Sequence, residues 1–221
     1  EKPFVSGLVE EVLALNLLPA KRPLSAIKAE HLRKKYWSIV QQDINERSLP
    51  KFVLDKLPLN LAYVPLLNHV FERPKFIVSL RHPLDCILSC YFQDFESNAG
   101  MIHTTDLNDT AAFYAETMGA WLECKKTMDL NFIYVRYEDL ILNKNLELIK
   151  VAEFLGVEQD VESLDNVGLA LQRDIVNTPS YRQISQPIYR NAINRWKSYT
   201  KHLGNCVKII APIAHELGYD I

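Results

Sequence analysis

Three polar residues of chemical interest stand at the ends of short apolar runs: Lys56, Arg81 and Tyr137. The three runs are Phe52–Leu54, Phe76–Leu80 and Phe132–Tyr137. If these runs are parallel strands, their carboxyl ends meet at one edge of a sheet, which is where open α/β sheets bind ligands. A lysine, an arginine and a tyrosine at three such ends would line one crevice, and together they could hold an anion or a base.

The junction Arg81-His82-Pro83 has the pattern of a phosphate site. Pro83 suits the first position of a helix, where its missing N–H would have no partner in any case. The N–H groups that follow and the helix dipole attract anions, and Arg81 could add a bidentate grip on a phosphate. Ser89 lies seven residues after His82 on the same helix face and could donate its hydroxyl.

Each of these residues also has a purely structural interpretation. Arg81 could pair with the nearby carboxylate of Asp85 while Ser89 merely packs, since structural ion pairs are common. Lys56 taken alone is typical of a solvated surface charge, and Tyr137 of a half-buried core residue. The basic cluster is most simply a solvated helix face; its members are Lys28, Arg33, Lys34 and Lys35.

The elements that would position these residues alternate between strands and helices, which predicts βαβ units. We therefore expect an α/β fold with a mainly parallel sheet flanked by helices, forming a single domain over residues 1–221. Helices are predicted over 4–18, after Ser25, and over about 60–71, 84–95, 110–128, 145–155 and 191–216. Gly156 is the expected end of the sixth helix. Long loops are predicted over 96–109 and 172–190.

The composition is that of an ordinary globular domain: 48% of the 221 residues are hydrophobic, 24% are charged, and the net charge is −2. This balance argues against a dedicated nucleic-acid binder. No Cys/His set has the spacing of a metal site, and no apolar run approaches the roughly 20 residues of a membrane span. Four scattered cysteines mildly favour a reducing compartment, so we expect a cytoplasmic protein.

Four segments, in this order, give the chain a family resemblance: FVLDKLPLN, FIVSLRHPLDCILSCYFQDF, VRYEDL and NTPSYRQISQPIYRNAINRWKSY. The chain resembles the PAPS-dependent sulfotransferases from Glu1 to the IAPIAHELGYD end, most of all the tyrosylprotein and tetratricopeptide-linked branch. The resemblance implies a P-loop-NTPase-like α/β fold. It also implies 3′-phosphoadenosine 5′-phosphosulfate (PAPS) as donor, 3′,5′-ADP as product, no metal, and an acceptor hydroxyl on a tyrosine, a sugar or a small alcohol.

The resemblance also implies roles for particular residues. Arg81 and Ser89 match the pair that holds the 3′-phosphate of PAPS, Tyr137 matches the tyrosine near the adenine, and Lys56 matches the lysine that contacts the bridging or sulfuryl oxygens. Ser180 matches a serine at the nucleotide end. The segment that covers the 3′-phosphate is matched by Tyr189, Arg190 and Asn191. By position, Glu1 matches the glutamate that serves as the acceptor's base in the tyrosylprotein branch.

The chain departs from the family pattern at its start. It contains neither GxGxxG nor GxxxxGK[ST], and the PRSGTT-like loop that grips the 5′-phosphosulfate is missing. We expect the N-terminal strand–loop–helix unit to belong to a longer parent protein. A non-catalytic sulfotransferase-like binding module is the alternative, and a nucleotide kinase would need a GK[ST] loop. A homodimer is left open, and an animal tyrosylprotein type would lie in the Golgi lumen.

Overall fold

The computed structural model describes residues 4–15, 24–44, 52–93, 95, 101–157 and 192–221. Some of the predicted site residues lie outside these ranges, as does the predicted loop over 172–190; they are Glu1, Ser180, Tyr189, Arg190 and Asn191. The chain divides into two compact units. The first comprises Glu1–Pro74 and Cys124–Leu130, and the second comprises Lys75–Glu123 and Asn131–Ile221. That residues 1–221 form one domain stays a prediction.

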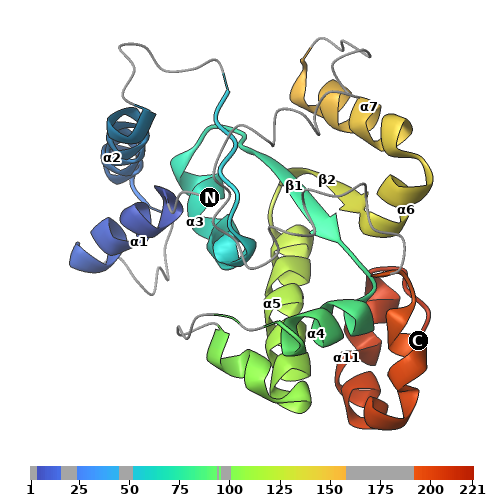
Figure 1. The fold of residues 1–221 in the computed structure, drawn as a ribbon. Helices are drawn as coiled ribbons and strands as arrows, with labels where there is room; N and C mark the ends of the chain where they lie inside the picture. Colours follow the sequence, from blue (N-terminus) through green and yellow to red (C-terminus); the bar gives the residue numbers. More distant parts are fainter. Residues whose placement is uncertain (1–3, 16–23, 45–51, 94, 96–100, 158–191) are drawn as a thin grey trace. The chain divides into compact units, whose positions relative to one another are not determined.

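The first unit is helical. Its elements are α1 (Phe4–Ala14), α2 (Ala26–Ile44), the 3-10 helix η1 (Pro58–Tyr63) and α3 (Val64–Val70). α1 packs against α2 (Figure 1). The apolar side chains that recur at helical intervals on both helices form one core, made of Val5, Leu8, Val12, Leu32, Tyr36 and Val40 with Val70.

The predicted strand at Phe52–Leu54 is wrong: residues 52–57 belong to no helix or strand. The segment is extended, and Val53 packs on the core of the first unit. Phe52 and Leu54 remain 50% and 75% exposed. An apolar run becomes a strand only when a neighbouring strand pairs with its backbone. Here only Val53 packs on the core, and no strand forms.

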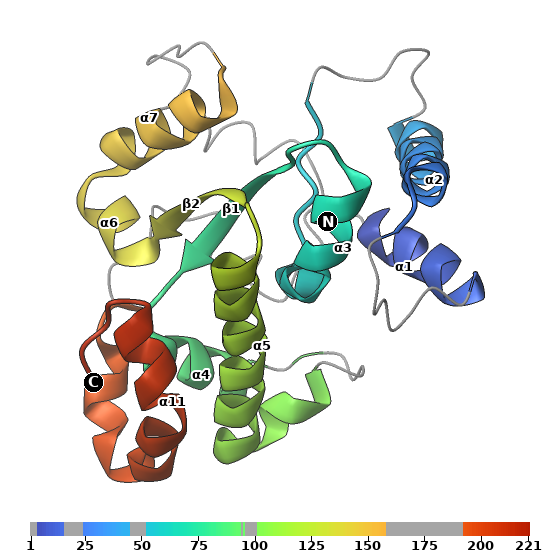
Figure 2. The same cartoon turned by 180° about the vertical axis from the view of Figure 1, so that it is seen from behind.

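The second unit holds a two-stranded parallel sheet of β1 (Lys75–Leu80) and β2 (Asn131–Arg136). Helices α4 (Pro83–Tyr91) and α5 (Leu107–Thr127) follow β1 in the chain and precede β2, so the crossover is the predicted βαβ arrangement (Figures 1 and 2). The α/β fold with a parallel sheet is therefore confirmed. Leu80 pairs in register with Arg136, which places the two strand ends side by side.

Among the described residues, this unit also contains the helices η2 (Met101–Thr105), α6 (Tyr137–Leu142), α7 (Lys144–Leu155), η4 (Arg195–His202) and α11 (Gly204–Glu216). α7 ends at Gly156 in the left-handed conformation, with φ of 73°, as predicted. The single helix predicted over 191–216 is instead η4 and α11, separated at Leu203, and η2 occupies part of the predicted loop 96–109.

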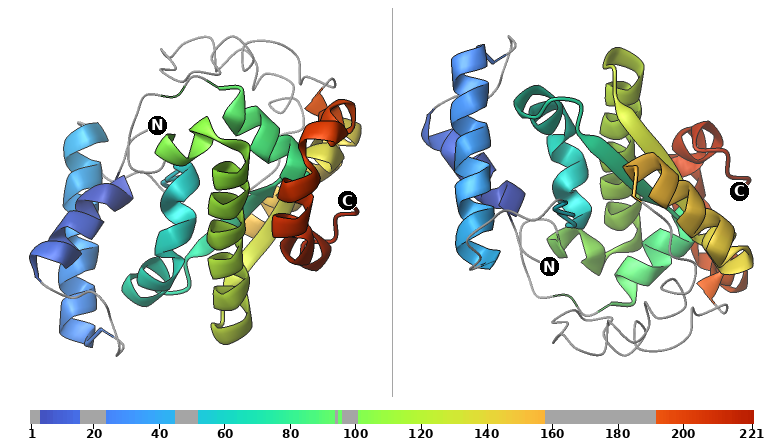
Figure 3. Two further views of the ribbon diagram at one scale, coloured as in Figure 1. Left: turned by 90° about the horizontal axis from the view of Figure 1, so that it is seen from below. Right: turned by 90° about the horizontal axis from the view of Figure 1, so that it is seen from above.

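The core of the second unit joins α4 to the C-terminal helices. Leu84, Ile87 and Leu88 of α4 are fully buried together with Leu203, Cys206 and Ile210, so α11 lies directly against α4 (Figure 3). Among the described helices, none combines the length and the apolar character needed to cross a membrane.

Candidate functional site

Two of the predicted site residues meet at the carboxyl ends of the paired strands. Arg81 directly follows β1, and Tyr137 directly follows β2 as the first residue of α6. The guanidinium carbon of Arg81 lies 5.3 Å from the centre of the Tyr137 ring, a cation–π distance. The guanidinium of Arg81 could bind an anion, and the ring of Tyr137 could pack against a planar ring of the same ligand.

Arg81 has donor capacity that the described protein does not use. One terminal nitrogen, Nη2, donates to the carbonyl of Ala192 at 2.8 Å, while the buried Nε has no hydrogen-bond partner within the described residues. A guanidinium carries five N–H donors in a fork that matches the oxygens of a phosphate. A buried N–H without a partner is costly, and a bound anion would satisfy it.

The ion pair considered for Arg81 and Asp85 does not form in the described structure. Asp85 is only 1% exposed, and its two carboxylate oxygens accept the backbone N–H groups of Asn194 and Trp196, each at 2.8 Å. Asp85 thereby caps η4, which begins after Asn194 in the left-handed conformation. The guanidinium of Arg81 is left to other partners.

Helix α4 begins as the sequence predicts, with Pro83 at its first position and His82 as the preceding cap residue. Ser89 lies on α4 two turns later, and its side chain is exposed. An exposed hydroxyl on the helix that follows Arg81 is available to a ligand.

A carboxylate that the sequence analysis did not single out links the two strand ends. Oε1 of Glu138 accepts the backbone N–H of His82 at 2.8 Å, and Oε2 accepts the hydroxyl of Tyr219 at 3.2 Å. Glu138 directly follows Tyr137 in the first turn of α6, where an acidic residue is favourable. No local sequence signal points to these contacts, because the partners His82 and Tyr219 lie 56 and 81 residues away in the chain.

The C-terminal residues pack onto the same place. His82, 7% exposed, donates from Nε2 to the carbonyl of Asp220 at 2.9 Å, and its ring stacks on Trp196 at 4.9 Å. Arg136 donates from Nη2 to the carbonyl of Leu217. The guanidinium carbon of Arg136 also lies 4.4 Å from the ring centre of Tyr219. His82, which follows Arg81, and Arg136, which precedes Tyr137, thus both contact the C-terminal residues.

Lys56 belongs to the first unit, in the extended segment before η1. Its side chain is exposed, and partial desolvation lowers the pKa of its ammonium group from the usual 10.5. Because no strand precedes it, the strand-end argument does not apply to Lys56. That Lys56 joins Arg81 and Tyr137 in one site stays a prediction.

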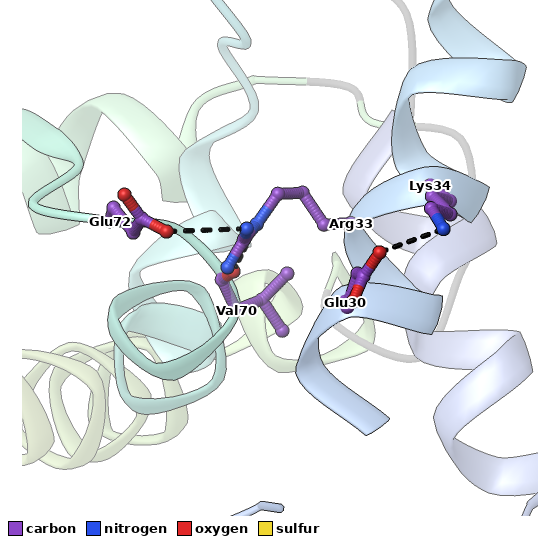
Figure 4. A network of polar contacts seen from close by, with 5 residues as sticks. All are labelled: Glu30, Arg33, Lys34, Val70 and Glu72. Atoms are coloured by element: carbon purple, nitrogen blue, oxygen red, sulfur yellow. Dashed lines mark hydrogen bonds and ion pairs between the residues drawn. The ribbon is translucent and has the colours of Figure 1, made fainter. Parts of the chain in front are cut away.

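The basic cluster of α2 is not a free cationic face (Figure 4). Arg33 donates from Nε to the carbonyl of Val70 at 2.9 Å and lies 3.5 Å from the carboxylate of Glu72. Lys34 pairs with Glu30 at 2.7 Å, one turn earlier on the same helix. These contacts offset the positive charge locally, so the cluster is a structural feature of the first unit.

The Cys86 thiol lies beside Arg81 and is protonated. Burial raises the pKa of Cys86 to about 12, so this thiol stays protonated at neutral pH. Its S–H points to the carbonyl of Arg81, with 3.8 Å between sulfur and oxygen. Within the described ranges, no group of three or more His, Cys, Asp and Glu side chains has the arrangement of a metal site.

Comparison with known proteins gives matches of three kinds: a family model, a relative and a solved structure. The family model described as "Sulfotransferase family" matches residues 14–161, a range that contains Lys56, Arg81, Ser89 and Tyr137. An uncharacterized protein of Aquifex aeolicus (strain VF5) is 25% identical over 159 residues. That alignment covers 72% of this chain and 20% of the relative, so the chain spans about a fifth of that protein's length.

The third match is a solved structure, the sulfotransferase domain from the curacin biosynthetic pathway. It superposes with a TM-score of 0.60 at 18% sequence identity, covering 98% of this chain and 80% of that chain. At this identity the likeness establishes the fold. It extends over both compact units.

Proposed function

We propose that this chain, which belongs to the sulfotransferase family, takes part in the transfer of a sulfuryl group from PAPS to an acceptor hydroxyl. One observation carries the proposal: the guanidinium of Arg81 lies against the Tyr137 ring at the carboxyl ends of two parallel strands, and its buried Nε has no hydrogen-bond partner among the described residues. A nucleotide with a 3′-phosphate supplies both the anion and the aromatic ring that such a site suits.

In this proposal, Arg81 and Ser89 hold the 3′-phosphate, and Tyr137 packs beside the adenine. The geometry that supports these roles is the unused donor of Arg81, the exposed hydroxyl of Ser89 and the position of the Tyr137 ring. Binding of the nucleotide in one position orients the donor, and this lowers the entropic part of the activation barrier for sulfuryl transfer.

The donor supplies a sulfuryl group on a phosphate leaving group. Its sulfur–oxygen bond to the phosphate breaks, a sulfur–oxygen bond to the acceptor forms, and the acceptor's proton passes to a carboxylate base. We propose Glu1 as that base and Lys56 as the cation that stabilises the charge growing on the leaving oxygen. The lowered pKa of Lys56 reflects partial desolvation, and a cation interacts more strongly with an anion where water is partly excluded.

The finer form of the proposal places the chain in the tyrosylprotein branch, with the hydroxyl of a tyrosine as acceptor. A direct test incubates the protein with ³⁵S-labelled PAPS and one of three acceptors: an acidic tyrosine peptide, an oligosaccharide, or a small alcohol. Label transferred to the peptide supports the branch. Label transferred only to another acceptor contradicts the branch while supporting sulfuryl transfer.

The variant Arg81→Ala tests the donor site in the same assay. Loss of charge-assisted hydrogen bonds to a phosphate should raise the donor KM about tenfold to a hundredfold and also lower kcat. The acceptor KM should stay within about twofold, because the guanidinium does not face the acceptor in this proposal. Unaltered donor kinetics in a folded Arg81→Ala protein would contradict the assignment.

A further inference from the structure

We propose that the C-terminal segment Leu217–Asp220 is a positioning element for the nucleotide site, acting through Tyr219 and Glu138 rather than by touching the nucleotide. The inference rests on the proposed function, because it takes Arg81 and Tyr137 as the residues that hold the nucleotide. It assigns a role to three contacts that sulfuryl transfer does not itself require.

The first contact is the bridge made by Glu138. Its two carboxylate oxygens accept from two different parts of the chain, the backbone N–H of His82 and the hydroxyl of Tyr219. Tyr219 is 8% exposed, and its ring edge also meets the His82 ring at 5.4 Å. A shared carboxylate of this kind fixes the distance between the β1–α4 junction and the start of α6.

The second and third contacts involve Arg136 and the side chain of His82. The carbonyl of Leu217 accepts from Arg136, and the carbonyl of Asp220 accepts from His82. Gly218 between them has φ of 76°, and a Cβ atom there would lie 3.2 Å from Nη2 of Arg136. The left-handed backbone at this position favours glycine, and a larger residue would also require the Arg136 side chain to shift.

These contacts bracket the nucleotide site in the sequence as well as in space. Tyr137 lies between Arg136 and Glu138, both of which contact the C-terminal segment, and Arg81 directly precedes His82, which contacts it too. The C-terminal segment consequently holds the sequence neighbours of both Arg81 and Tyr137. A side chain whose neighbours are fixed loses less conformational freedom when it binds a ligand.

The variant Tyr219→Phe isolates the central hydrogen bond, because it keeps the ring between Arg136 and His82 and removes only the hydroxyl. We expect 3′,5′-ADP to bind about five- to tenfold more weakly in calorimetric titration of the full chain. Tyr199→Phe is the matched control: this partly buried tyrosine of the same unit contacts Phe92 and Arg195 instead. The control should bind within about twofold of wild type.

Three further variants separate positioning from general destabilisation. In Glu138→Gln, the amide oxygen can still accept from His82 and the amide N–H can donate to the Tyr219 hydroxyl, so we expect affinity within about threefold of wild type. Glu138→Ala should weaken binding at least tenfold. In an Arg81→Ala background the Tyr219→Phe effect should shrink to less than twofold, since the positioned group is gone.

The outcomes distinguish this inference from the proposed function. If Arg81→Ala weakens 3′,5′-ADP binding while Tyr219→Phe and Glu138→Ala bind as wild type does, the positioning role is overturned and the nucleotide site stands. If Tyr219→Phe weakens binding equally with and without Arg81, the segment acts by stability alone, and the inference is also overturned. If wild type does not bind 3′,5′-ADP, the proposed function fails, and the inference fails with it.

Discussion

At the scale of single residues, the second unit shows how a folded chain accommodates carboxylates that are buried, as Asp85 is, or partly buried, as Glu138 is. Asp85 and Glu138 each use both carboxylate oxygens to accept hydrogen bonds, three of the four from backbone N–H groups. Burying a charged group is costly unless its hydrogen bonds are satisfied. Arg81 has a buried N–H that has no partner within the described ranges, and this observation supports our proposal that Arg81 binds a ligand.

The first unit offers a pH prediction at Asp55. Burial raises the pKa of this carboxyl above its usual 3.8, while hydrogen bonds from Asn60 and Tyr36 act in the opposite direction. The folded state therefore binds the proton more readily than the unfolded chain does. The contribution of Asp55 to the free energy of unfolding should fall as the pH rises from about 4 through the raised pKa, and then level off.

Urea unfolding of wild type and Asp55→Asn between pH 3.5 and 6.5 measures this effect. We expect the stability of wild type relative to the variant to decrease with pH across that interval, because the asparagine does not titrate. The exposed Asp129→Asn serves as control. A relative stability that rises with pH would contradict the burial argument.

Local sequence predicted some residue positions well and missed others for a physical reason. Pro83 and Gly156 mark a helix start and a helix end because their backbone restrictions act within one turn. Glu138 was missed because its partner His82 lies 56 residues away in the chain. Such a contact is decided by tertiary packing, which no local pattern encodes.

At the scale of elements, the sheet edge and the α4–η4 contact decide where the site lies. β1 and β2 bring Arg81 and Tyr137 together through their paired ends, as parallel-strand geometry predicts. The same reasoning failed at Phe52–Leu54, where a short apolar run belongs to no strand. An apolar run alone does not make a strand, because backbone pairing depends on a neighbour elsewhere in the chain.

Asp85→Asn tests the link between α4 and η4. The amide places an N–H group where one carboxylate oxygen now accepts a backbone N–H from Asn194 or Trp196, so one buried donor loses its acceptor. We expect the free energy of unfolding to drop by about 2 kcal/mol in urea titration. The exposed Asp129→Asn should change it by less than about 0.5 kcal/mol. Equal stability of the two variants would contradict the capping role.

At the scale of the whole molecule, the chemistry that we propose draws on both compact units. Lys56 belongs to the first unit, and Arg81 with Tyr137 belongs to the second. The sequence resemblance covered both, and the fold match extends over 98% of the chain. The acceptor could not be inferred from the sequence, because hydroxyl acceptors of very different shape can serve the same transfer chemistry.

Lys56→Met tests the division of roles between the units. In our proposal Lys56 stabilises charge that grows on the leaving oxygen, so its removal should lower kcat about a hundredfold. That oxygen stays on the 5′-phosphate of 3′,5′-ADP, so we expect the affinity for this product to fall as well. Lys56→Arg, which keeps the positive charge, should recover part of kcat. An unchanged kcat in Lys56→Met would exclude the lysine from the reaction.

The measurement closest to the central claim compares 3′,5′-ADP with 5′-AMP in calorimetric titrations of wild type and Arg81→Ala. The two ligands differ only by the 3′-phosphate, so their affinity ratio reports the grip of Arg81 on that group. We predict that wild type prefers 3′,5′-ADP by about tenfold to a hundredfold and that Arg81→Ala loses this preference, whereas Arg73→Ala, an exposed arginine, keeps it. Equal affinity of wild type for both ligands, or a preference that survives in Arg81→Ala, would contradict the account.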